Sequence, residues 1–250
     1  MTTEGVSAIR RREERPQATL QAGPYGGSGK RKPSLNCTSH PSKKQTIRAF
    51  IAVELPLPVK QWLTGIQNRL KKDLGNASWP GPNSFHLTLA FLGHIPKSDI
   101  VRVVESMDKA VYPYPGFELY ASGLGVFPSA KNPRVLWAGI RGRTDMLHAL
   151  VNELEQELQV SAGYKTNKKR FTPHLTLARI KPAAPIKTKK RRGGRQRSGP
   201  LTPGRVIQWM QEFQTDQSEP FDVKKIGLMK STLHATGAVH EHLYSANLRN

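Results

Sequence analysis

The chain has 250 residues, 37% of them hydrophobic, and its 39 Lys and Arg against 18 Asp and Glu give a formal net charge of +21. A charge of this size indicates a polyanionic partner, and nucleic acid is the first one to expect. The single cysteine, Cys37, excludes an internal disulfide framework, and no apolar run approaches the ~18 residues that a membrane-spanning helix needs.

The positive charge is concentrated in two segments that have little apolar character. Residues 1–46 hold nine Lys or Arg against three acidic residues, and residues 181–205 hold nine against none. We therefore expect a disordered basic N-terminal arm over 1–46 and a folded domain over 47–250, with a basic loop insertion at about 183–202. Because the rest of the chain is only mildly basic, the charge does not locate a site.

The arginines at 10–12 are followed by no apolar segment, so no secretory signal is expected. With one cysteine and no membrane span, we expect a soluble, cytoplasmic protein that acts as a monomer.

Hydrophobic periodicity predicts the elements in chain order. Apolar residues at every second position indicate strands, and spacings of three and four indicate helices. The expected elements are a strand at 47–53, a helix at 58–72, a strand at 85–94 that turns away at Gly93, a helix from Ser98, strands at 117–121 and 134–140 on either side of a turn-rich segment, a helix at 144–160, a strand at 171–180, a helix at 204–214, and strands at 221–229 and 242–248.

Two of these strands repeat one pattern. In FHLTLAFLGH, His86 and Thr88 share one face of the strand, and leucines occupy the other. In FTPHLTLARI, 88 residues later, His174 and Thr176 are arranged in the same way. With a helix before and after each strand, this predicts an α+β fold of two duplicated lobes, built of largely antiparallel sheet with flanking helices around a central cleft.

A single His beside a Thr on a strand is most often structural, but two copies indicate a shared chemistry. Two imidazoles facing one cleft suit acid–base catalysis near neutral pH, because one can accept a proton while the other donates one. Threonine hydroxyls beside them are placed to hold the oxygens of a phosphate. The residues alone do not say which histidine is the acid.

The paired motif resembles that of the two-histidine phosphoesterase superfamily. The wider context is similar to the LigT-like RNA 2′,3′-cyclic phosphodiesterases, once studied as 2′-5′ RNA ligases. The segments that carry the resemblance are IRAFIAVELP, FHLTLAFLG, GLGVFPSAKNPRVLWAGI, RFTPHLTLAR and KKIGLMKSTL.

The resemblance implies metal-independent hydrolysis of RNA 2′,3′-cyclic phosphate ends to 2′-phosphomonoesters, without a cofactor. It implies that His86 donates a proton to the leaving 3′ oxygen and that His174 accepts one from water. Thr88, Thr176 and Arg179 would bind the substrate phosphate.

Arg179 raises a problem of parity, because it falls on the leucine face of its strand; a bulge or a strand end before it would resolve this, and a surface arginine without a role in the site is the alternative. Arg134 and Trp137 also match the family, and we expect Trp137 in the core rather than stacked on a base.

Several alternatives stay open at this point. A reversible 2′-5′ RNA ligase or a phosphodiesterase of small cyclic nucleotides would carry the same motif, and a non-catalytic RNA-binding module is a rival from another class. His240 and His242 share a strand face and, with His234, could bind a metal, but no further ligand is evident, so we expect none. The histidines expected at the surface or at caps are His40, His94 and His148. The basic segments could steer RNA toward the site or have no role.

Overall fold

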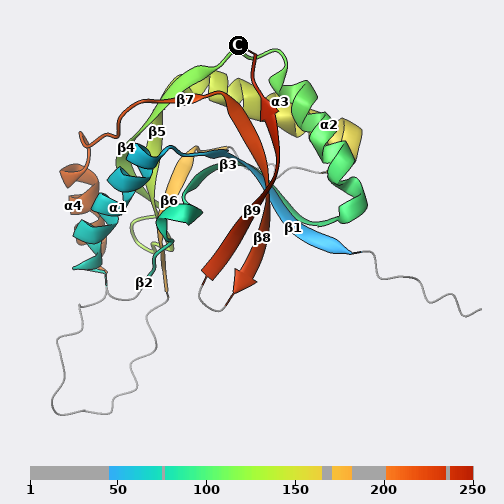
Figure 1. Ribbon diagram of the computed structural model, residues 1–250. Helices are drawn as coiled ribbons and strands as arrows, with labels where there is room; N and C mark the ends of the chain where they lie inside the picture. The colour runs from blue at the N-terminus through green and yellow to red at the C-terminus, as the bar shows by residue number, and fades with distance from the viewer. Residues whose placement is uncertain (1–44, 75–76, 165–170, 182–200, 235–236, 250) are drawn as a thin grey trace, which may run out of the picture. The chain divides into compact units, whose positions relative to one another are not determined.

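Residues 45–74, 77–164, 171–181, 201–234 and 237–249 are described by a computed structural model (Figure 1). The basic arm expected over 1–46 and the basic loop expected at about 183–202 lie almost wholly outside these ranges, as do Cys37 and His40. Both segments therefore stay predictions. None of the helices in the described ranges is long and apolar enough to cross a membrane.

Nine strands, four α-helices and two short 3₁₀ turns make up the described residues. In chain order they are β1 (Thr46–Glu54), α1 (Leu57–Lys71), β2 (Ala77–Ser78), η1 (Pro82–Ser84), β3 (His86–Pro96), η2 (Lys97–Asp99), α2 (Ile100–Val111), β4 (Phe117–Phe127), β5 (Val135–Gly142), α3 (Thr144–Ala162), β6 (His174–Ile180), α4 (Pro203–Glu212), β7 (Phe221–Val223), β8 (Lys225–His234) and β9 (Gly237–Asn247).

The strands form two sheets in which every pairing is antiparallel. One sheet has the order β3-β1-β8-β9 and the other the order β2-β6-β5-β4-β7. The two motif strands, β3 and β6, thus belong to different sheets, and each pairs with the strand that precedes it in the chain apart from the short β2. The predicted α+β fold of antiparallel sheets with flanking helices is confirmed.

The duplication is visible in the topology. The units β1-α1-β3-α2-β4 and β5-α3-β6-α4-β8 repeat one order of elements, and the last strand of each unit joins the sheet of the other. The helices are exchanged as well. α2 and α3 pack together against the sheet that holds β3, whereas α1 and α4 pack on the sheet that holds β6 (Figure 1).

One hydrophobic core runs through both repeats, because these exchanges interleave their apolar faces. Its fully buried side chains come from helices and sheets alike, among them Leu63 of α1, Leu87 of β3, Leu147 of α3 and Trp209 of α4. The leucines of both motif strands are part of it, which leaves their opposite faces for the histidines and threonines.

Several predicted boundaries were wrong. The last strand, expected at 242–248, begins earlier, as β9 at Gly237. The strand expected at 221–229 is two strands, β7 and β8, which join different sheets after Val223. β3 does not turn away at Gly93, because this glycine adopts φ of +72° and pairing continues to Pro96. The segment after Ala121 was expected as a turn, but β4 extends through it to Phe127.

Candidate active site

The two motif histidines occupy equivalent positions at the first residue of their strands. His86 begins β3 and His174 begins β6, and both are half-buried. The leucines that follow them are fully buried in the core, so the alternation of the strand fixes the histidines on the opposite face.

Each imidazole is oriented by the backbone just before it. Nδ1 of His86 lies 2.9 Å from the carbonyl oxygen of Ser84, and Nδ1 of His174 lies 2.8 Å from that of Thr172. A carbonyl only accepts, so Nδ1–H donates in both rings. In the neutral form each histidine therefore keeps an unprotonated Nε2. This nitrogen is the one available to a substrate.

A bulge in β6 places Arg179 on the histidine face. Trp137 of β5 pairs with Thr176, and the preceding Leu136 pairs with Ala178, so Leu177 is an extra residue in the ladder. Leu177 and Ala178 are both buried, and Arg179 emerges exposed on the side of Thr176. Of the two explanations that the parity of the sequence allowed, a bulge or a strand end, the register shows the bulge.

The bulge is held by a helix from the other repeat. Gln67 of α1 is almost fully buried, and its amide donates to the carbonyl oxygens of Leu177, at 2.8 Å, and of Pro80, at 3.0 Å. A bulged carbonyl has no ladder partner, so this side chain supplies the missing hydrogen bond. Sequence patterns gave no sign of this role for Gln67.

β3 carries the same bulge at the equivalent residue, Leu89. The two strands read HLTLAF and HLTLAR, so Phe91 occupies the place that Arg179 has in β6. Phe91 is 51% exposed on the histidine face, and the guanidinium of Arg48 lies 4.7 Å from its ring centroid. The two halves of the site thus differ at this position.

His86 lies in an aromatic cluster with Phe50 of β1 and His240 of β9. Its ring centroid is 4.7 Å from that of Phe50 and 5.1 Å from that of His240. Burial, followed by the charge of His240, lowers the pKa of His86 to about 4. The free protein therefore holds His86 neutral at physiological pH.

His174 lies beside Phe127 and Trp137, whose ring centroids are 5.1 and 6.3 Å away. The expectation of a core position for Trp137 was wrong: its half-buried indole lies on the face that carries His174. Gly125 of β4 makes this possible, because a Cβ there would overlap the indole ring. The glycine that suggested a turn is thus a strand residue that makes room for a tryptophan.

The two motifs act on each other electrostatically. β3 and β6 contact each other although they belong to different sheets. After burial and the charge of His240, the charges of Arg179 and His174 also lower the pKa of His86, whereas the hydrogen bond to Ser84 raises it. His86 therefore lies within electrostatic reach of His174 and Arg179 of the second motif.

The remaining histidines lie apart from this pair or support it. His242 shares a face with His240, as predicted, and its Nδ1 lies 3.4 Å from a carboxylate oxygen of Glu54. His94 and His234 are exposed. His148, expected at the surface or at a cap, is half-buried against Phe171 within α3. Within the described ranges, no three His, Cys, Asp or Glu side chains are grouped as a metal would need.

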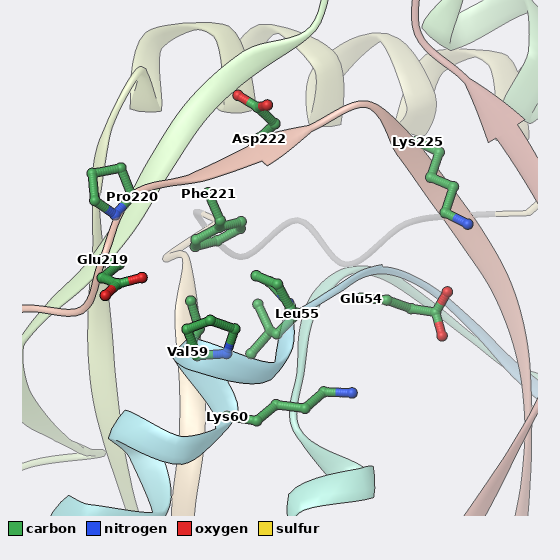
Figure 2. Close-up of a pocket in the computed structure, with 11 residues that line it drawn as sticks. Glu54, Leu55, Val59, Lys60, Glu219, Pro220, Phe221, Asp222 and Lys225 are labelled. Carbon is green, nitrogen blue, oxygen red and sulfur yellow. The ribbon is translucent and has the colours of Figure 1, made fainter.

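A cavity of about 580 Å³ is lined by none of the motif residues. It lies where β1 meets α1 and faces β7, and it is lined by Glu54, Leu55, Pro56, Pro58, Val59, Lys60, Glu219, Pro220, Phe221, Asp222 and Lys225. Figure 2 shows the apolar side chains of Leu55, Val59 and Phe221 close together, with the charged ends of Glu54 and Lys225 further out. None of its lining residues carries the motif chemistry.

Comparison with known proteins identifies the family of the chain. A family model described as LigT like Phosphoesterase matches residues 53–137. The RNA 2′,3′-cyclic phosphodiesterase of Thermotoga maritima is 35% identical over 135 residues, which cover 54% of this chain and 71% of that protein. This chain belongs to the LigT-like phosphoesterase family.

Other members extend the match over more of the LigT-like domain. The RNA 2′,3′-cyclic phosphodiesterase of Aquifex aeolicus is 27% identical over 199 residues, covering 78% of this chain and 94% of its own length. The crystal structure of TT0787 of Thermus thermophilus superposes with a TM-score of 0.62 at 24% identity, covering 81% of this chain and 98% of that one. This structural likeness supports the LigT-like fold.

Proposed function

We propose that the protein hydrolyses 2′,3′-cyclic phosphate ends of RNA to 2′-phosphomonoesters, with His86 and His174 as the acid–base pair. The observation that carries the proposal is the matched orientation of the two imidazoles, each donating through Nδ1 to a backbone carbonyl and leaving Nε2 free. The relatives named RNA 2′,3′-cyclic phosphodiesterase support the choice of substrate.

In the proposed reaction, the cyclic phosphate lies between the two motifs, with Thr88, Thr176 and Arg179 binding its oxygens. Nε2 of His174 takes a proton from water while the water oxygen bonds to phosphorus. The bond from phosphorus to the 3′ oxygen breaks, and that oxygen takes a proton from Nε2 of His86. One water is consumed, and exchange with solvent restores both histidines. Each proton transfer contributes ~10²–10⁴-fold to the rate.

Because its pKa is low, His86 can donate a proton only when something stabilises its protonated form. With a pKa of about 4, the ring carries no proton at neutral pH until something stabilises the imidazolium. A phosphate anion bound beside it does so, because an opposite charge favours the charged form. We therefore expect bound substrate to raise the pKa of His86, so that at neutral pH a larger fraction of the enzyme–substrate complex than of the free enzyme carries the donor proton.

A module that only binds RNA is disfavoured by the same geometry. Phosphate binding alone needs fixed positive charge, whereas burial keeps His86 neutral. No feature of the described residues favours ligation or a small cyclic nucleotide over hydrolysis of an RNA end.

The test uses an RNA ending in a 2′,3′-cyclic phosphate, with excess EDTA in the buffer. We expect the wild type to produce a 2′-phosphate end and His86→Ala and His174→Ala to lose at least ~10²-fold in kcat/KM. His94→Ala, on the same strand as His86 but exposed, is the matched control and should keep its activity. Absence of hydrolysis by the wild type, or full activity in both motif variants, would overturn the proposal. A 3′-phosphate product would overturn the assignment of the leaving oxygen.

A further inference from the structure

The histidine face of the sheet that holds β3 continues past His86 into a second cluster of side chains. Phe50 of β1 touches the ring of His86 and pairs in register with Phe91 of β3. Phe91 is half exposed, and the guanidinium of Arg48 lies over its ring. The buried ring of Phe50 thus neighbours both the proposed proton donor and Phe91, the exposed aromatic ring over which the guanidinium of Arg48 lies.

Arg48 is held in place without being neutralised. One of its terminal nitrogens donates to Oγ of Ser231, a buried residue of β8, at 3.0 Å. Among the described residues, no Asp or Glu forms an ion pair with Arg48. Its charge acts on a neighbouring imidazole: burial is the first cause that lowers the pKa of His240, and the charge of Arg48 is the second. An oriented guanidinium with free N–H groups suits a phosphate oxygen.

The position of Phe91 is set by the fold. The bulge at Leu89 turns Phe91 onto the histidine face, where the repeat in β6 has Arg179. Thr88 and Phe91 are separated along the strand by at most about 10 Å. The next nucleotide of an extended RNA strand can cover this distance from a phosphate held at Thr88.

We propose that Arg48 and Phe91 form a subsite for the nucleotide that precedes the cyclic phosphate end of RNA. Arg48 binds the phosphodiester that joins this nucleotide to the terminal one, and Phe91 stacks on its base. This proposal rests on the proposed function, and it makes the preferred substrate an oligonucleotide rather than a cyclic mononucleotide. Base stacking on an aromatic side chain corresponds to about 5- to 150-fold in affinity.

The experiment compares kcat/KM for adenosine 2′,3′-cyclic phosphate with kcat/KM for the dinucleotide ApA ending in a 2′,3′-cyclic phosphate. We expect the wild type to prefer the dinucleotide at least fivefold. Arg48→Met and Phe91→Ala should each reduce this preference toward one. Arg102→Met, an exposed arginine paired with Asp99, and Tyr112→Ala, an exposed aromatic, are matched controls that should keep it.

Two altered dinucleotides test the same contacts in the unmutated protein. Removing the upstream base should abolish the contribution of Phe91, and a neutral methylphosphonate linkage should abolish that of Arg48. These measurements decide the matter even where a variant does not fold.

The outcomes separate the two proposals. Hydrolysis of neither substrate by the wild type overturns the proposed function. Hydrolysis of both with equal kcat/KM, or variants that leave the preference unchanged, overturns the subsite and leaves the proposed function standing.

Discussion

The imidazole of His240 meets that of His86 edge to face, with the ring centroids 5.1 Å apart and the ring planes at 88°. β9 is three strands away from β3 in the same sheet, which in a flat sheet would put them about 14 Å apart. The contact exists because the sheet curls, and the curl brings a C-terminal residue against the proposed proton donor.

This contact predicts that His240 sets the pH range of the reaction. His240→Phe keeps an aromatic ring over His86 but removes a group whose charge lowers the pKa of His86. The pKa of His86 should therefore rise, and kcat/KM at neutral pH should rise with it, because a larger fraction of the donor carries its proton. The measurement is a pH profile of kcat/KM together with an NMR titration of His86, with His242→Phe on the same strand as the control. A pKa of His86 equal to that in the wild type would show that His240 does not act on His86.

The buried, neutral His86 predicts that the fold loses stability in acid. The unfolded chain binds its proton with the ordinary pKa of 6.5, and the folded chain with a pKa of about 4. Between these values the unfolded state holds more protons, so the free energy of unfolding falls as the pH falls from 6.5 toward 4. The loss from this group is at most about 3–4 kcal/mol. It should be absent in His86→Asn and retained in Thr88→Val, as urea unfolding at neutral and acid pH would measure. Equal losses in wild type and His86→Asn would contradict it.

Arg179 should act on the phosphate, because the bulge at Leu177 turns it toward Thr176. Arg179→Met is expected to lower kcat/KM for a cyclic phosphate by about 10²-fold, comparable with removal of one donor to a developing charge. Arg179→Lys should recover part of this loss, since it restores the charge but not the fork of N–H groups. Arg141→Met, an exposed arginine of β5, serves as the control. Activity of Arg179→Met close to that of the wild type would remove Arg179 from the site.

Gln67 should matter both for stability and for activity. Gln67→Leu leaves the carbonyls of Leu177 and Pro80 buried without a donor, at a cost of about 1–3 kcal/mol in the free energy of unfolding. Because the bulge that aims Arg179 loses its support, kcat/KM should fall as well. Gln61→Leu, at an exposed position of the same helix, should change neither quantity. A destabilised Gln67→Leu variant with unaltered kcat/KM would mean that the bulge holds its shape unaided.

Sequence patterns predicted the structure correctly where the alternation of apolar and polar residues was regular. Alternation in HLTL predicted which face carries His86 and His174. The parity of Arg179 indicated either a bulge or a strand end, and the register at Leu177 shows the bulge. These features depend on neighbours a few residues away. The same patterns failed where contacts with distant residues determine the structure. Gly125 lies in a segment expected as a turn, but it is a strand residue across which the indole of Trp137 lies.

The features of the site that could not be predicted from the sequence depend on contacts between residues far apart in the chain. Nothing near His240 in the chain indicates that it lies against His86, because the curl of a sheet brings them together over 154 positions. Gln67 likewise looks like an ordinary residue of an amphipathic helix, and its role depends on a carbonyl 110 residues away. The apolar run at 221–229 is divided after Val223 because its first part, β7, joins one sheet and its second part, β8, joins the other.

The exchange of helices and strands between the two repeats has a consequence for how such a protein can arise and be divided. Each sheet is covered by helices from both repeats and includes a strand donated by the other. A single repeat would expose the apolar surface that its counterpart now covers, and it would be complete only as a pair of identical chains related by a two-fold axis. A fragment ending between β4 and β5 should therefore be insoluble alone and regain its structure only when the complementary half is supplied in trans.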